Sequence, residues 1–177
     1  GRLAWQTGPD GSTERWVRDG EGNVRTHVDQ LGRSTTTETT AFDLPSVELG
    51  PDGSRKEFHY DTEMRLVAVV NERGETWRYE YDPAGDLVRE TDFGGRSVSY
   101  TYDAAGQLVA RTNAAGETVR FRYDLLGNLV ERRSPTGTTT FRYDPMGRLL
   151  EAANDATRVS FERDRLGRVL AETVNGR

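Results

Sequence analysis

Aspartates at regular intervals are the main chemistry-bearing residues in this chain of 177 amino acids. A carboxylate can act as a general acid, hold a calcium ion or accept hydrogen bonds from the backbone of a turn. The chain has no cysteine and only two histidines, which excludes disulfides and leaves little material for a metal site or a nucleophile–base pair. His27 and His59 have no serine or cysteine partner at a recognisable spacing, so we assign them no role.

The composition describes a polar chain of about one domain's length. Hydrophobic residues make up 34% of it and the mean hydropathy is -0.77, so we expect no membrane span. Its 24 basic and 29 acidic residues give a net charge of -5 and are mixed along the whole length, which argues against a nucleic-acid-binding stripe. The chain begins without methionine and stops within a repeated pattern, and we interpret it as a piece of something longer.

A Tyr–Asp pair recurs along the chain at intervals of 21, 21, 21 and 20 residues. The pairs are Tyr60-Asp61, Tyr81-Asp82, Tyr102-Asp103, Tyr123-Asp124 and Tyr143-Asp144. From the second pair onward a glycine and a leucine follow at fixed distances, and these are Gly85 and Leu87, Gly106 and Leu108, Gly127 and Leu129, and Gly147 and Leu149. Arg163-Asp164 continues the series with the tyrosine replaced.

Each repeat predicts two strands and two tight turns. Trp77, Tyr79 and Tyr81 alternate with polar residues, which is typical of a strand with one buried face. The aspartate can accept a hydrogen bond from a backbone amide two residues on, and glycine at the fourth position tolerates a positive φ. Met64 stands where the phase demands glycine, so we expect that turn to differ in shape.

Residues 1–55 show the pattern less clearly than residues 56–177. Asp19 lies two periods before Asp61, but Asp29 falls out of phase, and Pro45 interrupts a threonine-rich run. We interpret residues 1–55 as degenerate repeat units with an irregular connection, and residues 56–177 as regular repeats that continue beyond the fragment. About sixteen strands result, and they predict an all-β fold in which tandem antiparallel β-hairpins, about 20–21 residues each, form a curved, spiralling open sheet.

The unit Tyr-x-Tyr-Asp-x-x-Gly-x-Leu at this spacing resembles the YD repeat of Rhs proteins, most clearly in residues 53–170. The resemblance implies a spiralling β-sheet that winds into a hollow shell. In that family the shell encloses the toxic C-terminal domain of a secreted bacterial polymorphic toxin, or the hypervariable segment of an insecticidal toxin complex. Animal teneurins share the repeat as an adhesive extracellular module. Because Lys56 is the one lysine among many arginines, a bacterial origin is favoured.

One part of the family pattern has only a local counterpart here. Rhs shells end in a segment with paired Asp-Pro-x-Gly motifs, at which aspartyl self-cleavage releases the toxin. The stretches 82–85 and 144–147 have this form, with Pro83 and Pro145. Their neighbours in phase carry Asp-Ala-Ala-Gly or Asp-Leu-Leu-Gly, so we interpret both prolines as ordinary turn residues.

Two ligand-binding interpretations compete with purely structural ones. An aromatic row could stack on sugar rings, and its members would be Trp77, Tyr79, Tyr81, Tyr100 and Tyr102. Their regular place in the repeats favours packing between strands instead. The aspartates could bind calcium, but Asp-x-x-Gly lacks the closely spaced oxygen donors of a calcium loop, so turn capping is favoured.

We therefore predict a non-catalytic structural segment of an Rhs-type β-shell that encapsulates a toxin domain, with no catalytic, cofactor-binding or metal-binding residues. The alternative is an extracellular adhesion module that binds carbohydrate or protein through the same repeats. An enzyme is a distant third interpretation, because no set of residues predicts one. The expected partners are the remainder of the same polypeptide shell and its enclosed toxin domain, together with secretion apparatus proteins, and not nucleic acid. By family resemblance the protein is expected to be secreted or at the bacterial cell surface.

Overall fold

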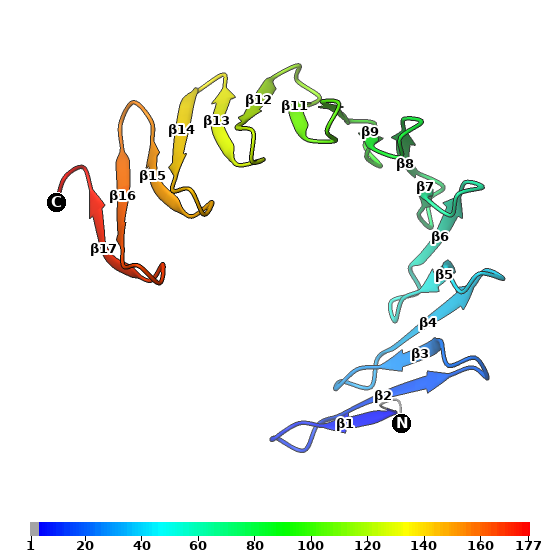
Figure 1. The fold of residues 1–177 in the computed structure, drawn as a ribbon. Coiled ribbons are helices and arrows are strands. Elements are labelled where there is room, and N and C mark those ends of the chain that lie inside the picture. The colour runs from blue at the N-terminus through cyan, green and yellow to red at the C-terminus, as the bar shows by residue number, and fades with distance from the viewer. Residues whose placement is uncertain (1–3) are drawn as a thin grey trace. The chain divides into compact units, whose positions relative to one another are not determined.

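Every regular element of residues 4–177, which the computed structural model describes, is a β-strand (Figure 1). These residues form seventeen strands and no helix, so none of them belongs to a helix able to cross a membrane. The strands are β1 (Trp5–Thr7), β2 (Thr13–Arg18), β3 (Val24–Val28), β4 (Ser34–Thr39), β5 (Pro45–Leu49), β6 (Arg55–Tyr60), β7 (Leu66–Val70), β8 (Thr76–Tyr81), β9 (Leu87–Thr91), β10 (Ser97–Tyr102), β11 (Leu108–Thr112), β12 (Thr118–Tyr123), β13 (Leu129–Ser134), β14 (Gly137–Tyr143), β15 (Leu149–Ala153), β16 (Arg158–Arg163) and β17 (Val169–Val174).

The seventeen strands of the described residues belong to one open sheet of antiparallel strands. Strands that are consecutive in the chain pair with each other, so the sheet is a succession of hairpins. The predicted all-β fold of tandem antiparallel hairpins is therefore confirmed. The chain forms two compact units, one of Gly1–Glu80 with Thr91–Gly95 and the other of Tyr81–Glu90 with Arg96–Arg177.

The turns fall into two alternating series. The first series follows the even-numbered strands, and its turns start at residues 19, 40, 61, 82, 103, 124, 144 and 164. The second series follows the odd-numbered strands, and its turns start at residues 8, 29, 50, 71, 92, 113, 134 and 154. The interval within each series is 20 or 21 residues.

Two details in the first fifty residues differ from the sequence interpretation. Asp29 is not out of phase, because it starts a turn of the second series. Thr40 occupies the place of the missing aspartate between Asp19 and Asp61, and its turn has the same backbone hydrogen bonds as the others. The boundary at residue 55 stays a prediction, since turns on both sides of it have one backbone geometry.

The two turn series differ in the strands that they join. Hairpins of the first series carry a β-bulge: in β10–β11, Thr101 pairs with Ala110 but Tyr102 pairs with Leu108. Val109 is thus the extra residue, and two residues of β11 lie opposite one residue of β10. This explains why Leu108 and Val109 are both half-buried although they are adjacent in a strand. Strand pairs of the second series, such as β11–β12, show no such shift.

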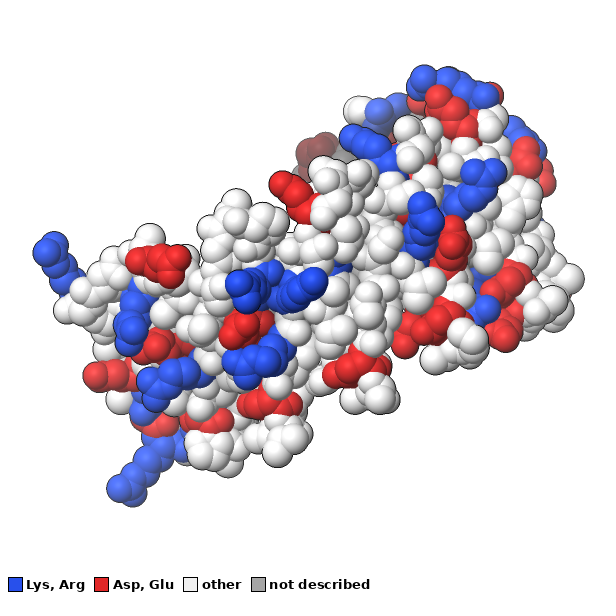
Figure 2. All heavy atoms as spheres, turned by 90° about the horizontal axis from the view of Figure 1, so that it is seen from above, with Lys and Arg blue, Asp and Glu red and all other residues white. Residues whose placement is uncertain are grey.

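The sheet has almost no enclosed interior. Among the described residues Val69 alone is a buried hydrophobic residue, with 8% of its surface exposed, and no polar residue is buried. Along the strands half-buried and exposed side chains alternate, as in β12. Basic and acidic side chains are interspersed on the face that Figure 2 presents. Half-burial of this kind is expected of a single layer of strands with no second layer upon it.

Candidate functional site: the repeated turn and tyrosine motif

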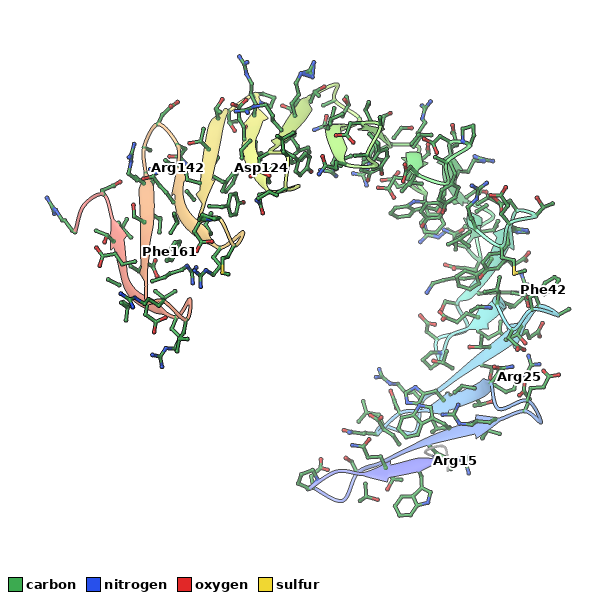
Figure 3. All side chains as sticks on the ribbon, in the orientation of Figure 1. Arg15, Arg25, Phe42, Asp124, Arg142 and Phe161 are labelled. Carbon is green, nitrogen blue, oxygen red and sulfur yellow. The ribbon has the colours of Figure 1, made fainter. Side chains whose placement is uncertain are left out.

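The aspartate of each regular first-series turn caps the turn with one carboxylate oxygen. Oδ1 of Asp82 accepts hydrogen bonds from the amides of Ala84 at 2.9 Å and Asp86 at 3.0 Å. Oδ1 of Asp124 accepts two equivalent bonds, from the second and fourth residues after it, at the turn between β12 and β13 (Figure 3). The sequence predicted the first of these bonds. The second, to the residue after the glycine, closes the turn from its far end.

In several turns of both series the second carboxylate oxygen of the aspartate is also used. Oδ2 of Asp144 accepts a bond of 2.6 Å from Nε of Arg148, four residues on. Oδ2 of Asp124 accepts one of 3.0 Å from Nδ2 of Asn128. Arg33, Arg65 and Arg168 repeat this contact with the aspartates four residues before them. With both oxygens engaged inside their own turns, these carboxylates are committed to turn structure.

These hydrogen bonds stabilise the ionised form of the turn aspartates. The backbone amide of Arg148 has the largest effect and lowers the pKa of Asp144; burial opposes it, and the Arg148 guanidinium lowers the pKa further. The Asn128 side chain and its amide lower the pKa of Asp124. A catalytic general acid would need the opposite shift, so the electrostatics of these carboxylates favour turn capping.

The glycine at the fourth turn position has the positive φ that the sequence predicted. Gly85 has φ 92°, Gly106 has φ 74°, Gly127 has φ 83° and Gly147 has φ 75°. Met64, in the same place, has φ 62°, and its amide donates to the carbonyl of Asp61 as a glycine's does. The expectation of a differently shaped turn at Met64 is therefore wrong, because the backbone bonds of the hairpin hold a methionine in the glycine conformation.

The predicted tyrosines and leucines meet across neighbouring hairpins. The hydroxyl of Tyr102 donates a bond of 3.0 Å to the carbonyl of Leu87, and the hydroxyl of Tyr123 does so to the carbonyl of Leu108 at 3.0 Å. Burial, followed by the nearby Asp86 and Asp82, raises the pKa of Tyr102. The motif residues Tyr60, Tyr81, Tyr143, Leu129 and Leu149 are half-buried at the equivalent strand ends.

The sequence interpretation missed one capping motif. The pentapeptide Gly-Pro-Asp-Gly-Ser occurs at residues 8–12 and again at residues 50–54. In these turns the cap is the third residue: Oδ1 of Asp52 accepts the amide of Ser54 at 3.0 Å, and Asp10 caps in the same way. A Cβ added at Gly50 would lie 2.9 Å from Oδ1 of Asp52, so a larger residue at the first position would displace this cap. The identical pentapeptide two periods apart was the available signal.

The aromatic row packs against itself. Trp77 stacks on Tyr79 with ring centroids 6.2 Å apart, and Phe93 meets Trp77 edge-on at 5.6 Å. Tyr100 donates a bond of 2.6 Å from its hydroxyl to Oε1 of Glu90 on the neighbouring strand. Aromatic pairs such as Trp77 with Tyr79 contribute about 0.5–1.5 kcal/mol to stability beyond the burial of their surface. The contacts support the packing interpretation of these side chains.

The remaining candidates form no constellation. His27 stacks on Trp16 with centroids 5.2 Å apart, and His59 lies on β6 near Glu57. Within residues 4–177 no group of three or more histidine, aspartate or glutamate side chains is arranged to hold a metal ion. At residue 145 the proline sits in a turn whose Asp144 oxygens are both engaged, as they are at Asp124, whose turn has no proline.

A solved structure shares this fold at low sequence identity. A structure of the Photorhabdus luminescens Tc holotoxin pore with a mutation in TccC3 is 16% identical, with a TM-score of 0.66, and the match covers 97% of this chain and 13% of that chain. A crystal structure of TcdB2-TccC3 is 14% identical over 97% of this chain and 15% of that one, but its TM-score of 0.34 is too low to bear on the fold. This chain thus spans about one eighth of the Tc toxin chain whose fold it shares.

Sequence comparison gives the family. Among curated proteins none matches the chain. The family model described as RHS Repeat matches four overlapping stretches, residues 60–97, 81–118, 102–139 and 123–159. Together these stretches cover more than half of the 177 residues and coincide with the turns capped by Asp61, Asp82, Asp103, Asp124 and Asp144. The predicted family is confirmed: the chain belongs to the RHS repeat family.

Proposed function

We propose that this chain is a segment of the wall of an Rhs-type β-shell, that it catalyses no reaction, and that the shell encapsulates the toxic C-terminal domain of a secreted bacterial polymorphic toxin. The partners of the segment are then the rest of the same polypeptide and the enclosed domain. Proteins of a secretion apparatus are the partners of the complete polypeptide. The protein acts outside the cell that makes it, in competition between bacteria.

The observation that carries the proposal is the single-layered sheet. A compact domain of about 150 residues removes roughly two thirds of its chain surface from water and encloses a core. Here Val69 is the one buried hydrophobic residue among those described, although seventeen strands are paired. A layer whose two faces both remain accessible is suited to separating an inner space from an outer one. The fold shared with a Tc toxin chain supports the same assignment.

The absence of catalysis is proposed from the commitments of the polar side chains. In the turns of Asp124 and Asp144 neither carboxylate oxygen is free to serve a cleft, because Oδ1 accepts backbone amides and Oδ2 accepts a bond from an asparagine or an arginine. The pKa values of Asp124 and Asp144 are lowered, which suits a permanent anion. The adhesion alternative relies on an exposed aromatic row, and the packing of Trp77 between Tyr79 and Phe93 argues for a structural use of that row.

The test is protease protection of the C-terminal domain in the full-length polypeptide that contains this chain. The parent should keep that domain intact under limited trypsin digestion, while a Gly106→Val, Gly127→Val double variant should release or expose it. Gly20→Val is the matched control, because Gly20 lies in a turn of the same series but has no positive φ itself, so its substitution should leave protection unchanged. Equal digestion of the C-terminal domain in the parent and in the double variant would contradict encapsulation.

A second measurement addresses the adhesion alternative. The same polypeptide is applied to a glycan array, with Trp77→Ala as the variant. Encapsulation predicts no glycan signal that depends on Trp77. Specific glycan binding that is lost on this substitution, together with an unprotected C-terminal domain, would replace the shell by an adhesion module.

A further inference from the structure

Strand pairs that connect one hairpin to the next are paired over only part of their length. In β11–β12 the paired positions run from Thr112 with Thr118 to Ala110 with Arg120, and stop there. In β15–β16 they run from Ala153 with Arg158 to Glu151 with Ser160. Pairs of the first series continue further, to Tyr123 with Leu129 in β12–β13. Successive hairpins are therefore unpaired at the end that lies beside the first-series turns.

A side-chain bond spans this unpaired end. Tyr123 ends β12 and Leu108 begins β11, and both lie beyond the last paired position of that strand pair. The bond of 3.0 Å from the Tyr123 hydroxyl to the Leu108 carbonyl joins them. Tyr102 makes the equivalent bond from β10 to Leu87 of β9, also at 3.0 Å. A carbonyl that lies beyond the end of the β11–β12 ladder is thus reached by the tyrosine of the next hairpin.

An arginine makes the same bond where the tyrosine is replaced. Nε of Arg163 donates to the carbonyl of Leu149 at 3.2 Å, across the unpaired end of β15–β16. Its Nη1 donates to the carbonyl of Gly167 in the following turn at 3.0 Å. The guanidinium also lies over the ring of Phe161, 5.8 Å from its centroid. The side chains differ in shape and charge, and what they share is a donor that reaches one carbonyl.

The turns at this end touch each other as well. Asn23, the last residue of one first-series turn, donates from Nδ2 to Oδ1 of Asp43 in the next at 2.7 Å. A Cβ added at Gly127 would lie 3.2 Å from Nε2 of Gln107, the last residue of the preceding turn. At Gly147 it would lie 3.3 Å from Oδ1 of Asn128. Contacts between turns and the Tyr or Arg bond therefore occur at the same end of the strands.

We propose that the residue before the turn aspartate, where its side chain reaches the carbonyl of the preceding hairpin, is a clamp that joins successive hairpins at their unpaired ends, and that it requires a hydrogen-bond donor and not an aromatic ring. Tyr102, Tyr123 and Arg163 are clamp residues on this definition. The clamp positions hairpins relative to one another where the backbone ladder has stopped. It concerns how the sheet is held together, and it stands whether or not the sheet encloses a toxin.

Substitutions at Tyr123 in the 177-residue chain distinguish the contribution of the hydroxyl donor from that of the aromatic ring. Tyr123→Phe keeps the ring and loses the donor, whereas Tyr123→Arg loses the ring and keeps a donor. Amide hydrogen exchange is measured at residues 110–112 and 118–120, the paired part of β11–β12. Loss of one net hydrogen bond should speed exchange about fivefold in the phenylalanine variant, and the arginine variant should stay within about twofold of the parent. A phenylalanine variant as protected as the parent, or an arginine variant less protected than it, overturns the clamp.

Two controls use positions that the chain already offers. Tyr143 precedes a turn aspartate too, but its hydroxyl makes no such bond to Leu129 within the described residues, so Tyr143→Phe should leave exchange in β13–β14 unchanged. The second control is a pair of variants at Arg163. Arg163→Tyr keeps a donor and should keep the protection of β15–β16 against amide exchange, whereas Arg163→Met removes the donor and should lose that protection. If both tyrosine-to-phenylalanine variants lose equal protection, ring packing explains the effect and the clamp is wrong. Should Tyr123→Phe fail to fold, the Arg163 pair decides.

Discussion

The turns at residues 50–54 and 103–107 reach one backbone geometry through different side chains. In the first, the amide of Gly53 donates to the carbonyl of Gly50 at 3.1 Å, and in the second Gly106 donates to Asp103 at 3.0 Å. The cap of the later turn is its first residue, whereas the cap of the earlier one is its third, Asp52. The hairpin thus dictates the backbone, and a carboxylate can satisfy the turn amides from either position.

The turn at residues 40–44 shows how far this tolerance extends. It has neither aspartate at its first position nor glycine at its fourth. Oγ1 of Thr40 accepts the amides of Phe42 at 3.2 Å and Leu44 at 3.3 Å, and Asp43 has φ 61°. The bonds are longer than those to the carboxylates in regular turns. We infer that a turn without the aspartate and the glycine keeps the geometry with weaker capping, and the following experiments test what the capping carboxylates and the turn glycines contribute.

Acidification should give the largest effect, because it acts on the capping aspartates of both regions at once. Side-chain bonds from serines lower the pKa of Asp10 and Asp52, and the Asn128 side chain lowers the pKa of Asp124. A carboxyl with a lower pKa in the folded chain stabilises the fold above its ordinary value of about 3.9, and this contribution is lost as pH falls below that value. We expect Tm by circular dichroism to stay level from about pH 7 to 5 and to fall below about pH 4.

The control for this experiment is Asp124→Asn, which keeps an amide oxygen for the cap and removes one titrating group. Its Tm should be lower than the parent's at neutral pH and should change less with acid. A parent Tm that is equal at pH 5 and pH 2 would show that the ionised caps contribute nothing to stability.

Valine at a turn glycine should give the next largest effect. Gly106 and Gly127 have φ 74° and 83°, a conformation that costs a β-branched residue about 1–3 kcal/mol. An added Cβ at Gly127 would also meet Gln107, whereas one at Gly106 would meet no atom within 4 Å. In urea unfolding, Gly127→Val should therefore be less stable than Gly106→Val, and both less stable than the parent.

Gly20→Val is the comparison for both valine variants. Gly20 lies in the first-series turn of β2–β3, has no positive φ and has no atom within 4 Å of an added Cβ. Its substitution should change the free energy of unfolding by no more than about 0.5 kcal/mol. Unfolding curves of the Gly106 and Gly127 variants that overlay the parent's would refute the assignment of these turns.

Restoring the missing glycine should give the smallest effect, and a favourable one. Met64→Gly removes the strain of φ 62° at a non-glycine residue and should stabilise the chain by about 1 kcal/mol. Asp43→Gly should gain less, because Asp43 accepts the bond from Asn23 that glycine cannot replace. Thermal unfolding of the two variants side by side measures the difference. If Met64→Gly destabilised the chain, the contacts of the methionine side chain would contribute more to the free energy of unfolding than its backbone strain costs.

Most of the fold could be read from local patterns. The period of 20–21 residues located the turns capped by Asp82, Asp103 and Asp124, because capping and positive φ depend on residues within five positions of each other. Asp29 was misjudged and the turn at Thr40 was missed, because the first is recognised only when the second series is counted and the second has neither the aspartate nor the glycine. Met64 was misjudged for a different reason: strand pairing on both sides outweighs the preference of one residue for negative φ.

The sequence alone determined the repeat, its two strands, the capping aspartates and the family, because each depends on short-range chemistry repeated in phase. The tertiary structure decided which groups meet between hairpins. The bulge beside Tyr102 displaces Leu108 and Val109, and the ladder stops short of Tyr123, so a hydroxyl finds a carbonyl fifteen residues away. A contact between residues so far apart in the sequence cannot be read from a local pattern. It arises only when one bulged hairpin is paired with the next, and the bond from Arg163 to Leu149 shows that the geometry, and not the residue type, is what is repeated.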